Sequence, residues 1–247
     1  DRIGSQILTH YPETIQIAKT ITSQEAVLDT RQSSTIFIPE LAKDILEQIV
    51  FEARKSEFVD VKSGVSARLS ITAFENLVST AERRLLHSGD DKTGIRMSDF
   101  TGIIPAITGK IELVYEGEQE GAYNVALTLL GNAIKSLYSD FFPKIEKIEK
   151  QGVETPYDEI VSWFFNHSED FEILDDILEK DYTSILEKVK PLSEFVLKYQ
   201  VGVTSEEVCF WQEFVLWSLV EHKKLSKYRY AEGVQFKDPY GSFISGL

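Results

Sequence analysis

Apolar residues recur along this chain at intervals of three and four positions, which is the spacing of one face of an α-helix. The first clear stripe covers residues 41–53, and a second covers residues 74–85. The longest covers residues 122–141 and ends just before Pro143, a residue that stops helices. The pattern predicts three helices in the first 142 residues.

Residues suited to helix starts accompany several of these stripes. Pro39 precedes the first one, and its fixed φ suits a first helical turn. Ser70 or Thr72 is expected to cap the second helix. Thr204 and Glu207 match the capping box that opens a helix. The chain therefore carries both helix-forming stripes and the signals that delimit them.

The second part of the chain also has mainly helical spacing. Helices are predicted over residues 158–166, 171–178, 182–199 and 205–225. Strand-like patterns are confined to residues 6–9 and 35–38. We therefore expect an all-α fold, a helical bundle followed by a second helical region, with at most one or two short strands.

A boundary between the two helical regions is predicted at residues 143–156. Pro143, Gly152 and Pro156 break helices there, and the Lys/Glu-rich run 144–150 lies between them. The alternative is that this run continues as an exposed helix.

Composition narrows the classes of function. The chain has 247 residues, of which 43% are hydrophobic, and a formal charge of −14. That charge argues against binding nucleic acid or an anionic membrane surface. Acidic residues are concentrated within 151–200, which we interpret as a solvated helix face, with a docking surface for a basic partner as the alternative.

Motifs of a self-contained active site are missing from the sequence. It has no phosphate-binding loop, and His10, His87, His167 and His222 are not spaced as metal ligands. Cys209 is interpreted as a buried small hydrophobe, and a single cysteine fits the reducing cytoplasm. The acidic residues within 112–120 lack the spacing of a calcium loop, and we expect them to form the start of the helix that follows.

Arg68 is the residue with the sharpest chemical implication. It is expected at the N-terminus of the helix over 74–85, where a cation opposes the helix dipole at a cost of about 0.3 kcal/mol or more. Spacing alone leaves two compensating contacts equally open. One is a carboxylate, Asp60 or Glu75, and the other is a bound anion such as phosphate.

The segment Gly64-Val65-Ser66-Ala67-Arg68 resembles the second sensor motif of the AAA+ ATPases that include the magnesium chelatase ATPase subunit and the MoxR proteins. The opening Asp1-Arg2-Ile3-Gly4 resembles the end of that family's nucleotide-binding core, with Ile3 where the family usually has Phe. Segments 54–60, 81–84 and 105–121 are also similar to the family's helical lid. The resemblance extends over about residues 1–140.

This resemblance implies that residues 1–10 end a truncated AAA+ core, 11–142 form the lid and 143–247 form a C-terminal helical region. It implies ATP and Mg²⁺ for the full-length protein, with neither held by this piece alone. Arg68 would reach the γ-phosphate as the second sensor, and Arg2 would act as an arginine finger in a neighbouring subunit. The implied partners are the upstream core, the other subunits of a ring, and a remodelled protein or chelatase subunits.

Two other functions stay open at this stage. The chain could be a stand-alone helical interaction module that uses its acidic 151–200 region. An independent enzyme has least support, because the sequence has no nucleophile–base or metal constellation. The absence of an initial Met fits a fragment of a longer cytoplasmic protein, which the first interpretation requires.

Overall fold

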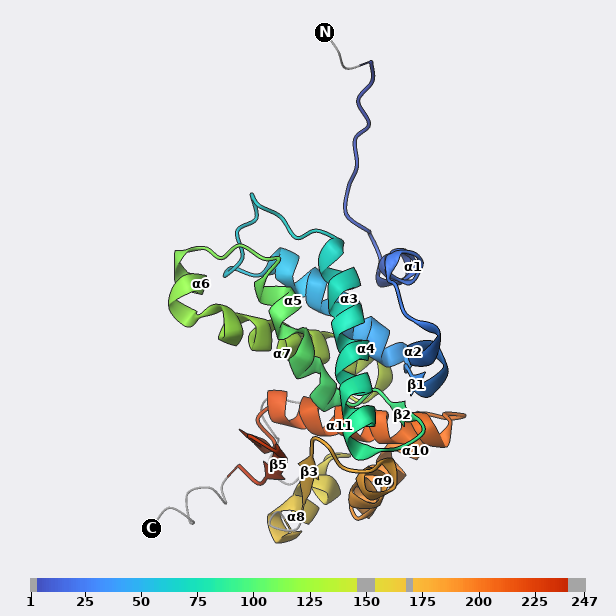
Figure 1. Cartoon of the computed structure of the whole chain (residues 1–247). Coiled ribbons are helices and arrows are strands. Elements are labelled where there is room, and N and C mark those ends of the chain that lie inside the picture. The colour runs from blue at the N-terminus through green and yellow to red at the C-terminus, as the bar shows by residue number, and fades with distance from the viewer. Residues whose placement is uncertain (1–3, 146–153, 168–170, 240–247) are drawn as a thin grey trace.

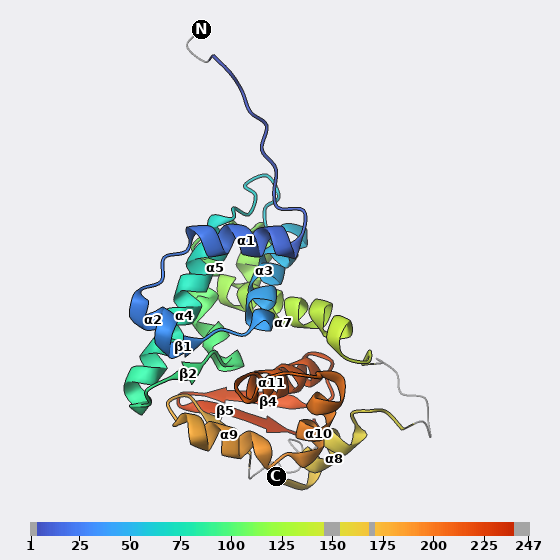
Figure 2. The same cartoon turned by 90° about the vertical axis from the view of Figure 1, so that its right-hand side faces the viewer.

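The computed structural model describes residues 4–145, 154–167 and 171–239 (Figures 1 and 2). Most of this part of the chain is helical, and its strands are few and short, so the predicted fold class is confirmed. The helices are α1 (Ile15–Glu25), α2 (Thr30–Thr35), α3 (Glu40–Lys55), α4 (Arg68–Ser88), the 3-10 helix η1 (Met97–Ile103), α5 (Ile104–Thr108), α6 (Tyr115–Glu120), α7 (Ala122–Phe141), α8 (Asp158–His167), α9 (Glu179–Glu187), α10 (Lys190–Tyr199) and α11 (Ser205–Glu221). The strands are β1 (Ile36–Phe37), β2 (Thr93–Gly94), β3 (Glu172–Leu174), β4 (Ser226–Tyr230) and β5 (Gly233–Lys237).

The first bundle is built on α3, whose apolar stripe packs between α4 and α7. The three stripes predicted in this part of the sequence all lie in these helices, and Pro39 occupies the N-cap position of α3. Their buried apolar residues form one cluster with α5 and η1. No helix among the described residues is long and apolar enough to cross a membrane.

The C-terminal region is arranged around α11, which is apolar on all sides and buried. Figures 1 and 2 show α11 between the first bundle and a layer formed by α8, α9, α10 and a small sheet. That sheet has the antiparallel order β3-β5-β4, with Ile173 opposite Val234. The capping box predicted at Thr204 and Glu207 opens α11, where the Glu207 carboxylate accepts the Thr204 amide at 3.1 Å.

Several predicted elements differ in the structure. The helix expected over 171–178 is wrong, because Phe171 and Ile173 are buried while their neighbours are exposed, and this alternation forms β3. The helix expected over 182–199 is two helices that meet at Val189, ahead of Pro191. The helix expected over 205–225 ends at Glu221, after which β4 and β5 form an unpredicted hairpin.

The two strand-like patterns had different outcomes. Residues 35–38 contain β1, which pairs in parallel with β2. Residues 6–9 have no strand assignment, and Ile7 and Leu8 are 84% and 92% exposed. The expectation of a strand there is therefore wrong within the described chain, because no neighbouring strand pairs with it.

A single hydrophobic cluster includes residues on both sides of position 143. Polar contacts cross the same border. Arg96 Nη2 donates to Glu179 Oε2 at 3.0 Å, and the Met97 amide donates to Glu213 Oε2 at 2.8 Å. Residues 146–153, the centre of the predicted boundary, lie outside the described residues, and the division into domains stays a prediction.

Candidate functional site at the start of α4

Arg68 is the first residue of α4, and its side chain is exposed. Ser66 Oγ accepts from the Arg68 amide at 3.3 Å and from its Nε at 3.4 Å. No ion pair joins Arg68 to any described residue. The two carboxylates considered as its partners make other contacts: Asp60 accepts from the Lys62 amide, and Glu75 accepts from the Val27 amide. The carboxylate partner considered for Arg68 is therefore not present in this part of the chain, and the guanidinium faces solvent.

The loop that precedes Arg68 is held from behind by Arg54 of α3. Nε and Nη2 of Arg54 both donate to the Val65 carbonyl at 3.3 Å. Arg54 also lies 4.2 Å from the centre of the Tyr11 ring, and the Tyr11 hydroxyl accepts from the Val65 amide at 3.0 Å. Both backbone groups of Val65 are thus occupied, one by α3 and one by the N-terminal segment.

Gly64 is required by the geometry of this loop. Its φ is +71°, a left-handed conformation that costs other residues energy. A Cβ at this position would also collide with the Tyr11 hydroxyl. The glycine of the motif therefore allows the N-terminal segment to approach the loop closely.

Glu47 fixes the first turn of α4 from inside the bundle. Its buried carboxylate accepts from Thr22 Oγ1 of α1 at 2.5 Å and from Ser70 Oγ of α4 at 2.7 Å. Burial raises the pKa of Glu47, although both hydrogen bonds act in the opposite direction. The expectation that Ser70 or Thr72 caps this helix is wrong, because α4 begins at Arg68 and both residues lie inside it. α4 has no capping side chain.

The loop and the N-terminal segment lie at the same end of the molecule (Figures 1 and 2). The Phe58 carbonyl accepts from the Val114 amide at 3.1 Å, which attaches the loop to the segment before α6. The C-terminal layer lies at the opposite end. Arg2, the other predicted site residue, lies outside the described residues.

In the acidic cluster at 112–120, Glu116, Glu118 and Glu120 belong to α6 and not to the long helix after it, whereas Glu112 precedes α6. Glu116 and Glu118 are in the first turn of α6, which Gly121 ends with a φ of 91°. The acidic residues were expected to open the long helix α7, and this is wrong, because they open the short helix α6 that precedes it. Within the described residues, no group of three or more His, Cys, Asp or Glu could hold a metal ion.

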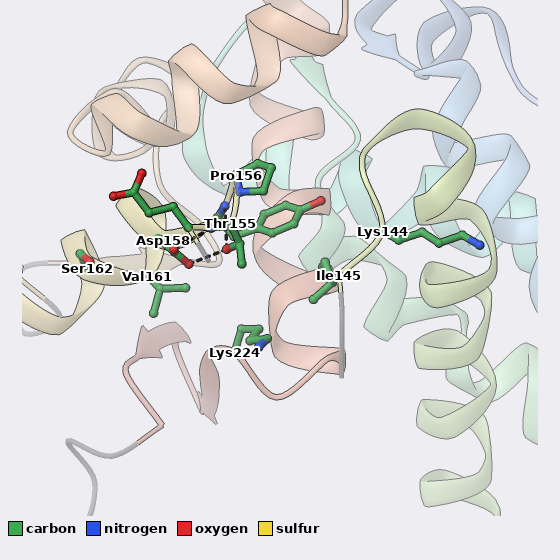
Figure 3. A pocket seen from close by; sticks show the side chains of 10 residues that line it. Lys144, Ile145, Thr155, Pro156, Asp158, Val161, Ser162 and Lys224 are labelled. Carbon is green, nitrogen blue, oxygen red and sulfur yellow. Dashed lines mark hydrogen bonds between the residues drawn. The ribbon is translucent and has the colours of Figure 1, made fainter. Parts of the chain in front are cut away.

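A pocket of about 370 Å³ lies elsewhere, beside the start of α8 (Figure 3). Its lining includes Lys144, Lys224, Tyr157 and Asp158. The Asp158 carboxylate is already engaged by the amide and hydroxyl of Thr155, which caps this turn. None of the lining residues belongs to α4 or to the loop before it, so this pocket is separate from Arg68.

Cys209 is buried, and its thiol lies 3.7 Å from Thr183 Oγ1. Burial raises the pKa of this thiol to about 11, which suppresses the reactive thiolate. Its interpretation as a packing residue is confirmed.

Sequence reasoning missed Tyr11, Arg54 and Glu47, which position the loop and the helix. Glu47 had a detectable signal, because it stands beside Leu46 within an apolar stripe, where a carboxylate needs partners. The contact between Tyr11 and Arg54 had none, because it depends on how the chain folds over the 42 positions between them. Comparison of the chain with family models, with curated proteins and with solved structures finds no match in any of the three.

Proposed function

We propose that this chain is the lid and C-terminal helical region of an AAA+ ATPase similar to magnesium chelatase and MoxR proteins. In this proposal the nucleotide-binding core, with ATP and Mg²⁺, is a separate domain of the same cytoplasmic protein. Hydrolysis there drives remodelling of a partner protein or insertion of a metal ion. Arg68 contacts the γ-phosphate, and Arg2 enters the site of a neighbouring subunit in a ring.

The observation that carries this proposal is the exposed Arg68 guanidinium at the start of α4. Its only hydrogen bond acceptor among the described residues is Ser66 Oγ. A planar guanidinium that faces solvent matches the oxygens of a phosphate. Negative charge that develops on the γ-phosphoryl oxygens during hydrolysis is stabilised by arginines of this kind.

The arrangement also supports coupling between hydrolysis and motion. An arginine on a helix of a lid binds differently before and after the γ-phosphate leaves, so the lid position follows the nucleotide state. In this proposal the nucleotide approaches the end of the molecule that carries the loop and the N-terminal segment.

Mutation of Arg68 tests the proposal in the protein that contains both the nucleotide-binding domain and this chain. Arg68→Ala is expected to lower ATP turnover by about 100-fold or more, because the positive charge that stabilises the transition state is lost. Arg83→Ala is the matched control, since Arg83 is another exposed arginine of the same helix. Equal turnover in the two variants, both with wild-type stability, would remove Arg68 from the mechanism.

A further inference from the structure

The N-terminal segment reaches the rest of the molecule at Tyr11. Residues 4–12 have no assigned helix or strand, and α1 begins only at Ile15. Within this segment, the Tyr11 ring lies over the Arg54 guanidinium and its hydroxyl accepts the Val65 amide. Tyr11 therefore connects an extended segment to the loop that leads into α4.

Arg54 completes this connection on the other side of the loop. Its guanidinium donates twice to the Val65 carbonyl and faces the Tyr11 ring, so one planar group contacts both partners. Its Nη1 is buried and has no hydrogen bond partner among the described residues. Burial lowers the pKa of Arg54, and the nearby Glu47 carboxylate acts in the opposite direction. Because Arg54 belongs to α3, which packs in the core, its contacts with Tyr11 and Val65 attach the N-terminal segment and the loop to the core.

Only two residues, Ser66 and Ala67, separate Val65 from Arg68. Val65 is 1% exposed and packs in the core, whereas Arg68 is exposed. A displacement of Tyr11 would remove the acceptor of the Val65 amide and open one face of Arg54. The backbone before Arg68 would then lose one of its two fixed points.

We propose that Tyr11 and Arg54 are positioning residues that couple the N-terminal segment to the loop carrying Arg68. A domain attached to this segment would move the loop through Tyr11, and the state of Arg68 would be felt by that domain through the same contact. This inference rests on the proposed function for the role of Arg68, but the coupling itself is a property of this chain and can be measured without nucleotide.

Hydrogen exchange of the Val65 amide tests the coupling in the chain as it is. Tyr11→Phe keeps the ring over Arg54 and removes only the acceptor, so exchange at Val65 is expected to rise about fivefold. Arg54→Lys is expected to raise exchange across residues 64–68, because an ammonium cannot reproduce the two bonds that converge on the Val65 carbonyl or the planar contact with Tyr11. Tyr228→Phe is the control, since Tyr228 is an exposed tyrosine of β4, in the C-terminal layer at the opposite end of the molecule from this loop.

Unchanged Val65 exchange in Tyr11→Phe, at an unchanged melting temperature, would overturn the coupling. Positioning is tested separately by ATP turnover in the protein that contains the nucleotide-binding domain. Tyr11→Phe is expected to lower kcat severalfold with little change in KM for ATP. If Arg68→Ala abolishes turnover but Tyr11→Phe leaves kcat unchanged, the positioning role is wrong. If Arg68→Ala leaves turnover intact, the proposed function fails, and the exchange result still decides the coupling.

Discussion

At the scale of single residues, Glu213 is a carboxylate buried in the core of the described chain. It is fully buried in α11, and its Oε2 accepts from the Met97 amide and from the Tyr182 hydroxyl at 2.8 and 2.7 Å. Its Oε1 has no hydrogen bond partner among the described residues. Burial raises the pKa of Glu213 to about 7, with Arg96 acting in the opposite direction and Asp99 in the same one.

This shift predicts how stability changes with pH. The folded pKa lies above the unfolded one, so the contribution of Glu213 is fully present below about 4.5 and is lost as the pH rises to about 7. Glu213→Gln keeps an acceptor and removes the titration. Relative to the wild type, the variant should gain about 3 kcal/mol in free energy of unfolding between pH 4.5 and pH 8.

Denaturant unfolding of both proteins at several pH values measures this difference. The comparison cancels the titration of all groups that the two proteins share. A difference that does not change with pH would mean that Glu213 stays ionised in the folded protein.

The buried thiol of Cys209 gives a second prediction at this scale. With a pKa of about 11 and little exposure, it should react with a thiol reagent such as iodoacetamide only after unfolding. The rate of alkylation in buffer and in denaturant measures this. Rapid alkylation of the native protein would contradict the described burial.

At the scale of elements, the helices with a one-sided apolar stripe were predictable, whereas α11 shows where this reasoning ends. α7 was expected at 122–141 and occupies those residues, because its pattern and Pro143 agree. Within α11, apolar residues face all directions, so the pattern could not locate its end or reveal the hairpin that follows. β3 was missed because its strand pattern covers only three residues.

The start of α11 provides a test at this scale. The Glu207 carboxylate accepts the Thr204 amide, which completes the N-terminal turn. Glu207→Ala should lower the free energy of unfolding by about 1 kcal/mol, the usual cost of a lost cap. Glu206→Ala, next to it and exposed, should cost clearly less, and chemical denaturation of both variants gives the comparison. Equal costs would show that the cap is not what matters at this turn.

At the scale of the whole molecule, the two helical regions share buried contacts that neither would keep alone. The ring of Tyr138 in α7 lies 5.7 Å from that of Phe214 in α11. The buried Arg96 depends on Glu179 of α9 for its ion pair. The sequence placed Arg68 near the start of a helix, but it could not show these pairings, because each joins residues more than 70 positions apart.

A shortened chain tests this dependence. A protein that ends at residue 142 would expose Tyr138. It would also take from Arg96 its ion-pair partner Glu179 and the Tyr182 ring, whose centre lies 4.0 Å from the guanidinium. The loss of this buried surface is destabilising. We expect it to lose cooperative thermal unfolding and to bind a hydrophobic dye, whereas the full chain should unfold in one transition. A shortened chain that melts cooperatively near the temperature of the full chain would show that residues 11–142 are an independent domain.

The central claim is that Arg68 contacts the γ-phosphate of a nucleotide held by another domain. The most direct measurement is the ratio of the Kd values for ADP and a non-hydrolysable ATP analogue in the protein that contains that domain, with and without Arg68→Ala. We expect the preference for the ATP analogue to fall by about tenfold or more, since a charge-assisted bond to the γ-phosphate is lost. An unchanged ratio would contradict the account.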